Sequence, residues 1–204
     1  MTARPLTAAV LLALLPLGGG ARAASWDASS RPLSGLARVA FDFGGTVVAS
    51  YGSAPAGSLD PPELHTLRAG QLITVSGGAL LRWRGPWSVE ATAGCKFDKL
   101  SASGDSVWFT RFPIDLLASV GGAHRLGAGA TLHLAPQVRC SGGGACSWTR
   151  TYSPAVGALL QYAWRSGETY GLEAGGRATL LRYRGTGLPT LDGNAVGVFA
   201  GVWF

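Results

Sequence analysis

After position 23 the chain has no run of about 18 apolar residues, so it contains no candidate for a transmembrane helix. Charged residues make up only 14% of the sequence, whereas glycine occurs 31 times and the mean hydropathy is positive at +0.23. A solvated secreted domain carries more charge than this. An apolar chain without long apolar runs is instead typical of a transmembrane β-barrel, because its lipid-facing residues alternate with lumen-facing ones.

Runs of basic residues are also missing. The formal net charge is +6, and removal of Arg4 and Arg22 with a leader peptide lowers it by two. No basic stripe with interleaved aromatic residues occurs, which excludes nucleic acid as an expected partner. The phosphates of lipopolysaccharide are the acidic neighbour that an outer-membrane location offers.

The first 23 residues have the features of a secretory signal peptide. Arg4 supplies a positive start, residues 8–17 are apolar, and Ala21-Arg22-Ala23 fits a small-x-small cleavage site. An N-terminal membrane anchor is the alternative, but the apolar stretch is too short to span a bilayer. We therefore expect a signal peptide at 1–23, a short periplasmic segment at 24–36 and one β-barrel domain at 37–204.

The remaining chain alternates between apolar and polar residues in eight segments that end at turn signals. We expect strands at roughly 37–50, 70–83, 87–99, 107–122, 130–140, 148–163, 170–183 and 195–204. Most exceed the 9–11 residues that a tilted membrane strand requires. The fold class predicted is all-β, as a single eight-stranded antiparallel up-and-down transmembrane barrel.

The connections between these segments alternate strictly between short and long. The short ones are 84–86, 124–129 and 165–169, and the longer ones are 52–69, 100–106, 141–147 and 184–194. Outer-membrane barrels have short periplasmic turns and longer external loops. The pattern therefore predicts that both the N- and the C-terminus are periplasmic.

The polar faces of the strands predict a polar network in the lumen. It comprises Asp42, Arg82, Glu90, Lys96, Asp98, Arg111, Asp115, His133, Arg139, Glu173 and Arg177. Five acids thus meet five lysine or arginine side chains, as a narrow lumen requires, because an unpaired buried charge costs several kcal/mol. The register expected from the short turns sets Asp115 beside Arg139 or one pair away from it, and Arg82 diagonal to Glu90. It also sets Gln161 opposite Glu173.

A soluble barrel of the lipocalin type, with its apolar face inward, is the rival fold. Its outer surface would then carry only these ten strand charges, which is sparse for a solvated surface. Aromatic residues favour the membrane alternative, since they cluster near both ends of the strands as interfacial girdles do. One girdle comprises Trp83, Trp87, Trp164, Tyr170 and Phe204, and the other Tyr51, Phe97, Trp108, Trp148 and Tyr183.

The last segment alternates up to the final residue, with Val196, Val198, Ala200, Val202 and Phe204 on one apolar face. This ending resembles the closing strand of outer-membrane barrels, in which a terminal aromatic residue serves as the assembly signal. Over nearly the whole mature chain, the sequence resembles the small eight-stranded barrels of the OmpA/OmpX-like superfamily. The resemblance implies a monomer in the bacterial outer membrane, in contact with outer-membrane lipids and lipopolysaccharide and inserted by the barrel-assembly machinery, which reads Phe204.

Of three cysteines, Cys140 and Cys146 bracket a glycine-rich loop tip. An oxidising compartment favours a disulfide between them. A metal site is the alternative, but no histidine or third thiol lies nearby, so we expect no metal. Cys95 is left over and is predicted to face lipid as a small apolar residue.

His133 is the main candidate for chemistry, because Ser119 is expected nearly opposite it on the preceding strand. Lipid A deacylases, which are also eight-stranded barrels, carry a His-x-Ser motif, but here Ala135 occupies the serine position. No third group orients the histidine. A lumen histidine in the polar network is therefore the preferred interpretation, and we predict no catalytic or cofactor-binding residues.

The function predicted from sequence is a non-catalytic, structural or surface-interaction role in the cell envelope. The alternative is a narrow channel or conduit for small or hydrophobic molecules, although an eight-stranded interior is just filled by side chains. A lipid A-modifying enzyme is the third and weakest candidate.

Overall fold

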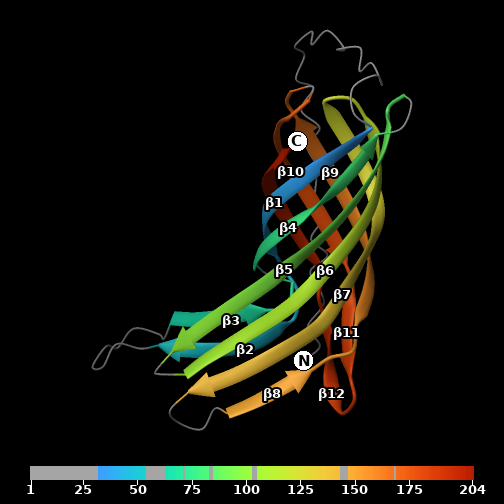
Figure 1. Ribbon diagram of the computed structural model, residues 1–204. Helices are drawn as coiled ribbons and strands as arrows, with labels where there is room; N and C mark the ends of the chain where they lie inside the picture. Colours follow the sequence, from blue (N-terminus) through green and yellow to red (C-terminus); the bar gives the residue numbers. More distant parts are fainter. Residues whose placement is uncertain are drawn as a thin grey trace, which may run out of the picture.

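The chain folds as a closed all-β barrel (Figure 1). The computed structural model describes residues 32–53, 63–70, 72–82, 85–102, 105–142, 147–167 and 169–204. Its strands are β1 (Leu33–Phe43), β2 (Val47–Ser53), β3 (Glu63–Arg68), β4 (Leu72–Arg82), β5 (Trp87–Ala102), β6 (Asp105–Gly121), β7 (His124–Gly142), β8 (Ser147–Thr151), β9 (Ala155–Arg165), β10 (Gly171–Leu180), β11 (Arg182–Gly185), β12 (Leu188–Asp192) and β13 (Ala195–Trp203). This described part contains no helix long and apolar enough to cross a membrane.

Eight strands form the barrel wall in the order β6-β5-β4-β1-β13-β10-β9-β7, and β6 pairs with β7 to close it. All these pairings are antiparallel, and each wall strand pairs with the next wall strand along the chain. The last strand, β13, returns to the first, from Leu36 opposite Trp203 to Phe43 opposite Val196. The predicted eight-stranded up-and-down barrel is confirmed.

The two ends of the barrel differ. The turns after β4, β6 and β9 and the C-terminus lie at one end, named here the terminal end (Figure 1). At the other, the hairpin end, β5, β6 and β7 extend beyond the wall, and β8 continues the sheet along β7. The hairpins β2–β3 and β11–β12 form separate two-stranded sheets at this same end.

Glycine ends the first wall strand earlier than the alternation indicates. Gly44 and Gly45 have φ angles of 127° and 84°, a region that side-chain-bearing residues rarely adopt. A Cβ on Gly45 would lie 2.2 Å from the backbone nitrogen of Gly70. The predicted strand 37–50 is therefore two strands, β1 and β2, and β1 begins at Leu33, within the segment expected to be periplasmic.

Other predicted boundaries shift in a similar way. The segment 148–163 divides into β8 and β9, and 170–183 divides into β10 and β11. The region 124–129, expected to be a turn, belongs to β7. The predicted signal peptide lies outside the described residues.

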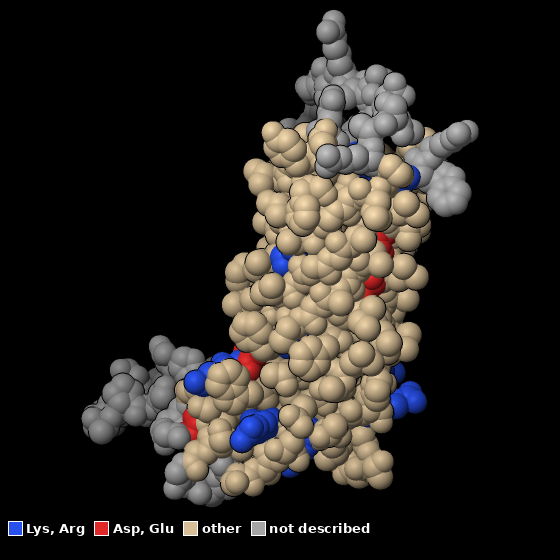
Figure 2. Space-filling view, in the orientation of Figure 1, with Lys and Arg blue, Asp and Glu red and all other residues tan. Residues whose placement is uncertain are grey.

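The outward face of the wall is apolar, and the inward face is polar. Large exposed apolar side chains occur on every wall strand, including Phe41, Val75, Val89, Leu116, Leu126, Leu160, Leu172 and Val198. Figure 2 shows a barrel wall with few charged atoms, whereas Lys and Arg gather towards the hairpin end. This inversion of the usual burial pattern is what a lipid-facing barrel needs.

Candidate functional site

Two arginines and two glutamates form a closed ion-pair network across the lumen. Arg38 on β1 donates through Nη2 to Glu90 Oε2 at 2.8 Å and to Glu173 Oε2 at 3.0 Å. Its Nε and Nη1 atoms also contact Glu173 and Glu90. Arg165 on β9 donates to the same two carboxylates, at 2.8 Å to Glu90 and 2.9 Å to Glu173.

This ion-pair network, called here the first charged layer, crosses the whole bore. Glu90 lies on β5 and Glu173 on β10, and these strands are four places apart in the ring of eight, so they are diametrically opposite. All four side chains are at most 5% exposed. Because each guanidinium is held by two carboxylates, the burial penalty of all four charges is offset by pairing.

A second charged layer lies nearer the hairpin end. Lys96 Nζ is 2.7 Å from Asp42 Oδ2 and donates to the carbonyl of Gly70 at 3.1 Å. Arg177 contacts Asp42 at 3.3 Å and Asp115 at 3.6 Å, and so links β10 to β1 and β6. Hydroxyls complete the layer: Thr74 donates to Asp42 at 3.2 Å, and Thr131 donates to Asp115 at 2.5 Å.

Arg111, which lies beyond the second charged layer towards the hairpin end, packs against two aromatic rings. Arg111 is fully buried, with its guanidinium carbon 4.2 Å from the centre of the Phe109 ring and 5.9 Å from that of Tyr183. The Tyr183 hydroxyl hydrogen-bonds Nδ1 of His133 at 2.6 Å. His133 is therefore held by a tyrosine of the β11–β12 hairpin.

An apolar cluster lies at the hairpin end of the lumen. Its buried members are Leu67, Ala69, Val107, Phe109, Val138, Cys140, Tyr152, Ala155, Leu181, Tyr183 and Leu191. They come from β3, β6, β7, β9, β11 and β12 and the connections beside them, so both hairpins contribute to one core. Burial raises the pKa of the Tyr152 hydroxyl above its ordinary value, since the charged form is penalised away from water.

The terminal end of the lumen carries further cations. Arg125 contacts the Ser88 hydroxyl and donates from Nε to the carbonyl of Gly122 at 3.0 Å. The guanidinium of Arg82, which is half-buried, lies 4.3 Å from the centre of the buried Trp203 ring. Charged side chains that are paired or stacked on rings therefore lie at the terminal end, in the middle and towards the hairpin end of the described lumen.

Ten of the eleven predicted network residues point into the barrel, and Arg139 does not. A β-bulge in β7 places Ala135 and Pro136 opposite the single residue Arg111 of β6, and Ala135 has a φ angle of 44°. The extra residue reverses the inward and outward sides beyond it, so Val138 and Cys140 are buried while Arg139 is exposed. The prediction that Arg139 lies in the lumen is therefore wrong.

The bulge and the observed register also change the expected partners. Asp115 pairs with Thr131 on β7, and Gln161 lies opposite Arg177 while Arg165 lies opposite Glu173. Arg82 is diagonal to Glu90 as expected, and Arg38 and Arg165 both bind Glu90.

Three further arginines point into the lumen that alternation did not predict there: Arg38, Arg125 and Arg165. Arg38 lies four residues before Asp42, and this spacing alone puts both on one face of a strand. Arg125 and Arg165 were assigned to turns, because the strands that contain them extend further than the alternation indicated. Tyr183, expected in an aromatic girdle, is fully buried in the lumen.

Ser119, the predicted candidate nucleophile, does not lie opposite His133. The cross-strand partner of His133 on β6 is Pro113, whereas Ser119 lies opposite Gly127, six residues further along the strand. Among the described residues, no group of three or more His, Cys, Asp or Glu side chains is arranged to hold a metal ion. Cys140 is buried in the apolar cluster and Cys95 is a half-buried free thiol. Cys146 lies outside the described residues, so the disulfide stays a prediction.

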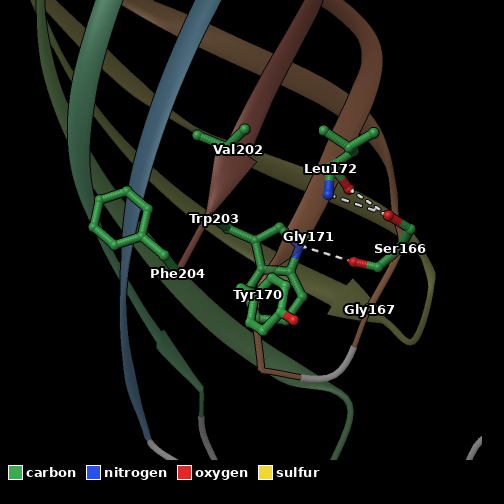
Figure 3. A pocket seen from close by; sticks show the side chains of 8 residues that line it. All are labelled: Ser166, Gly167, Tyr170, Gly171, Leu172, Val202, Trp203 and Phe204. Carbon is green, nitrogen blue, oxygen red and sulfur yellow. Dashed lines mark hydrogen bonds between the residues drawn. The ribbon is translucent and has the colours of Figure 1, made fainter.

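An apolar hollow opens on the wall at the terminal end, between β10 and β13 (Figure 3). Its lining residues are Ser166, Gly167, Tyr170, Gly171, Leu172, Val202, Trp203 and Phe204. Trp203 Nε1 donates to the carbonyl of Ser166 at 3.1 Å, which ties the closing strand to the turn before β10. Tyr170 and Phe204 are strongly exposed here, and Trp87 and Trp164 are exposed at the same end of the wall. These four rings lie where an interfacial girdle is expected.

Comparison with known proteins identifies solved structures with a similar fold, but no family model and no curated protein with a similar sequence. The Yersinia pestis attachment invasion locus protein Ail, solved with the heparin analogue sucrose octasulfate, aligns at a TM-score of 0.50 and 13% identity, over 84% of this chain and 98% of Ail. Another Ail structure aligns at 0.50 and 11%, over 85% and 99% of the two chains. Neisserial surface protein A aligns at 0.49 and 12%, over 85% and 96%.

At these identities the likeness concerns the fold alone. Together with the closed ring of eight strands, it shows that the chain has the architecture of the small eight-stranded outer-membrane barrels.

Proposed function

We propose that this protein is a non-catalytic, monomeric outer-membrane barrel with a closed lumen, whose hairpin end acts at the cell surface in a structural or interaction role. The observation that carries the proposal is the first charged layer, in which Arg38 and Arg165 join Glu90 and Glu173 across the full width of the bore. A lumen filled with mutually paired charges stabilises the wall. Any interaction with another molecule would then involve the outer surface of the barrel.

The apolar wall and the aromatic girdle support a membrane location. Lipid is then the solvent of the wall, and the terminal end, where β1 begins and β13 ends, faces the periplasm. Lipopolysaccharide and outer-membrane lipids are the expected neighbours, and the barrel-assembly machinery is the expected partner that recognises Phe204.

Single-cysteine labelling tests this orientation. In a background in which Cys95, Cys140 and Cys146 are all replaced by alanine, Thr186→Cys in the β11–β12 turn should react with a membrane-impermeant maleimide on intact cells. Thr169→Cys at the terminal end should react only after the outer membrane is permeabilised. Labelling of Thr169→Cys on intact cells would contradict the proposed orientation.

The closed lumen separates this proposal from a channel. The two charged layers and the apolar cluster each obstruct the bore, so we expect no stepwise conductance from the purified protein in planar bilayers. A reproducible unit conductance at neutral pH would favour the conduit alternative and refute the closed lumen.

The geometry around His133 argues against a lipid A-modifying enzyme. Its Nδ1 bonds Tyr183 inside the lumen, and Ser119 is too far along the strand to be activated by it. Mass spectrometry of lipid A from cells with and without the protein should show identical species, and any new acyl pattern would overturn this part of the proposal.

A further inference from the structure

The extension of β5–β8 beyond the wall aligns exposed side chains across four strands. Register places Lys99 of β5 opposite Trp108 of β6, Trp108 opposite Arg139 of β7, and Arg139 opposite Thr149 of β8. All four are exposed, so they form one continuous row on the outward face. The Lys99 ammonium lies 4.6 Å from the centre of the Trp108 ring.

Polar rows flank this central row on both sides, because residues two apart on a strand share a face. Towards the strand ends, the register aligns four serines: Ser101, Ser106, Ser141 and Ser147. Towards the barrel it aligns one aromatic residue, Phe97, with three polar ones, Thr110, Gln137 and Thr151. The Ser101 and Ser106 hydroxyls are 2.9 Å apart, and Gln137 donates to Thr151 at 3.4 Å. We call these three rows the outer polar face.

The outer polar face begins where the lipid-facing wall ends. The next outward side chains towards the barrel are Phe112 on β6 and Leu134 on β7, both exposed and apolar, followed by Ile114. The apolar-to-polar change thus occurs at the same level on neighbouring strands. The clustering of Lys and Arg over this part of the surface is visible in Figure 2.

The bulge at Ala135 creates this arrangement. Without the extra residue, Arg139 would point inward with the lumen charges, and Val138 would face out. With it, two cations stand two strands apart, about 10 Å at ordinary strand spacing, with an indole between them. The three rows contain no acidic residue.

We propose that the outer polar face binds the phosphorylated sugar headgroup of lipopolysaccharide in the outer leaflet. Lys99 and Arg139 pair with phosphates, since an ammonium and a planar guanidinium are the side chains suited to them. Trp108 lies against the sugar ring as an amphipathic interfacial side chain, and the serine and Gln/Thr rows hydrogen-bond sugar hydroxyls. Continuity with the apolar wall favours a lipid headgroup over a soluble acidic glycan, because acyl chains then lie along Phe112 and Ile114.

This inference rests on the proposed surface role of the hairpin end and names its partner. The test compares the full-length mature protein with Lys99→Gln/Arg139→Gln for binding of fluorescent lipopolysaccharide in detergent. Arg182→Gln/Arg184→Gln is the matched control, because it removes two exposed cations from the β11–β12 hairpin at the same end. Heat-modifiable gel migration confirms that every variant is folded.

We expect affinity to fall at least about tenfold in Lys99→Gln/Arg139→Gln, since a hydrogen bond to a charged group contributes more than the 1.4 kcal/mol that equals a factor of ten. The control should change by less than about twofold. Phosphatase-treated lipopolysaccharide should bind the unmodified protein as weakly as native lipopolysaccharide binds the double variant.

Three results would overturn the inference: unchanged affinity in the Lys99/Arg139 variant, an equal loss in the control pair, or dextran sulfate binding that exceeds lipopolysaccharide binding. The last would assign the face to a soluble acidic glycan. Conductance measured on the same preparations separates the two proposals, because a conducting protein refutes the closed lumen whatever its affinity for lipopolysaccharide.

Discussion

The ring of Phe204 covers Gly35 across the seam where the last strand meets the first. The backbone nitrogen of Gly35 donates to the Phe204 carbonyl at 2.6 Å, and Phe204 donates back to Gly35 at 3.1 Å. A Cβ on Gly35 would lie 2.5 Å from Cε2 of the ring. The final residue therefore closes both the hydrogen-bond ladder and the outer surface of the seam.

Substitutions at this seam should change the stability of the barrel by removing or displacing the Phe204 ring. We expect Phe204→Ala and Gly35→Ala each to lower the free energy of unfolding in lipid vesicles by about 1 kcal/mol, the scale of a good cross-strand pair. The double variant should be no worse than Phe204→Ala alone, because the methyl group then displaces nothing. Gly77→Ala is the control, since its Cβ would meet its nearest neighbour at an ordinary 3.5 Å.

Phe204→Asp, or deletion of Phe204, should have a larger effect in cells. A charged or missing terminal side chain removes the expected assembly signal, so we predict loss of outer-membrane protein and periplasmic degradation. Immunoblots of fractionated membranes measure this, and a normal outer-membrane yield would count heavily against Phe204 as the signal.

Glu173→Gln should destabilise the barrel strongly. It leaves Arg38 and Arg165 sharing one carboxylate in a buried site, and breaking a buried ion pair costs about 3–5 kcal/mol. Urea unfolding in lipid vesicles followed by tryptophan fluorescence measures the change. Asp192→Asn is the matched control, because its pair with Arg182 at 2.9 Å is largely exposed and should contribute under about 1 kcal/mol. Equal effects of the two changes would show that the lumen network does not stabilise the barrel.

Tyr183→Phe should lower the free energy of unfolding by about 1–2 kcal/mol. The ring keeps its edge contact with Phe109 at 5.5 Å, but His133 loses its buried hydrogen bond. Tyr162→Phe removes a similar 2.7 Å bond, to His124 at the exposed terminal end. We expect Tyr162→Phe to lower the free energy of unfolding by less, since interfacial water replaces the hydroxyl. A larger loss in Tyr162→Phe than in Tyr183→Phe would contradict a closed, dry hairpin end.

The predicted disulfide between Cys140 and Cys146 can be tested by counting reactive thiols before and after reduction. If Cys140 and Cys146 are joined, the denatured, unreduced protein has one reactive thiol, Cys95, and reduction raises the number to the three in the sequence. Closing so short a loop should stabilise the oxidised protein by about 2 kcal/mol relative to Cys146→Ser. Cys95→Ser should leave that difference unchanged, and three thiols before reduction would rule the bond out.

The faces of most wall strands followed from alternation alone, because a strand's side chains point to opposite sides with a period of two. The same rule failed at Arg139, since the single extra residue at Ala135 inverted every position beyond it. The predicted length of the first strand was wrong at Gly44 and Gly45. A segment with the composition of a strand ends there because the backbone turns away from the wall. The bulge leaves the alternation on each side of it intact, and a glycine pair such as Gly44-Gly45 occurs inside strands as well as at their ends, so local patterning revealed neither.

The sequence by itself determined a closed antiparallel barrel with an apolar exterior, since alternation, turn lengths and the terminal Phe204 are local properties. Tertiary structure alone decided which charges meet. Arg38, Glu90, Arg165 and Glu173 come from four strands up to 135 positions apart in the chain, and they meet only because closure of the ring places those strands around one narrow bore. The outer polar face likewise depends on register across four strands, which is set by pairing and by one bulge.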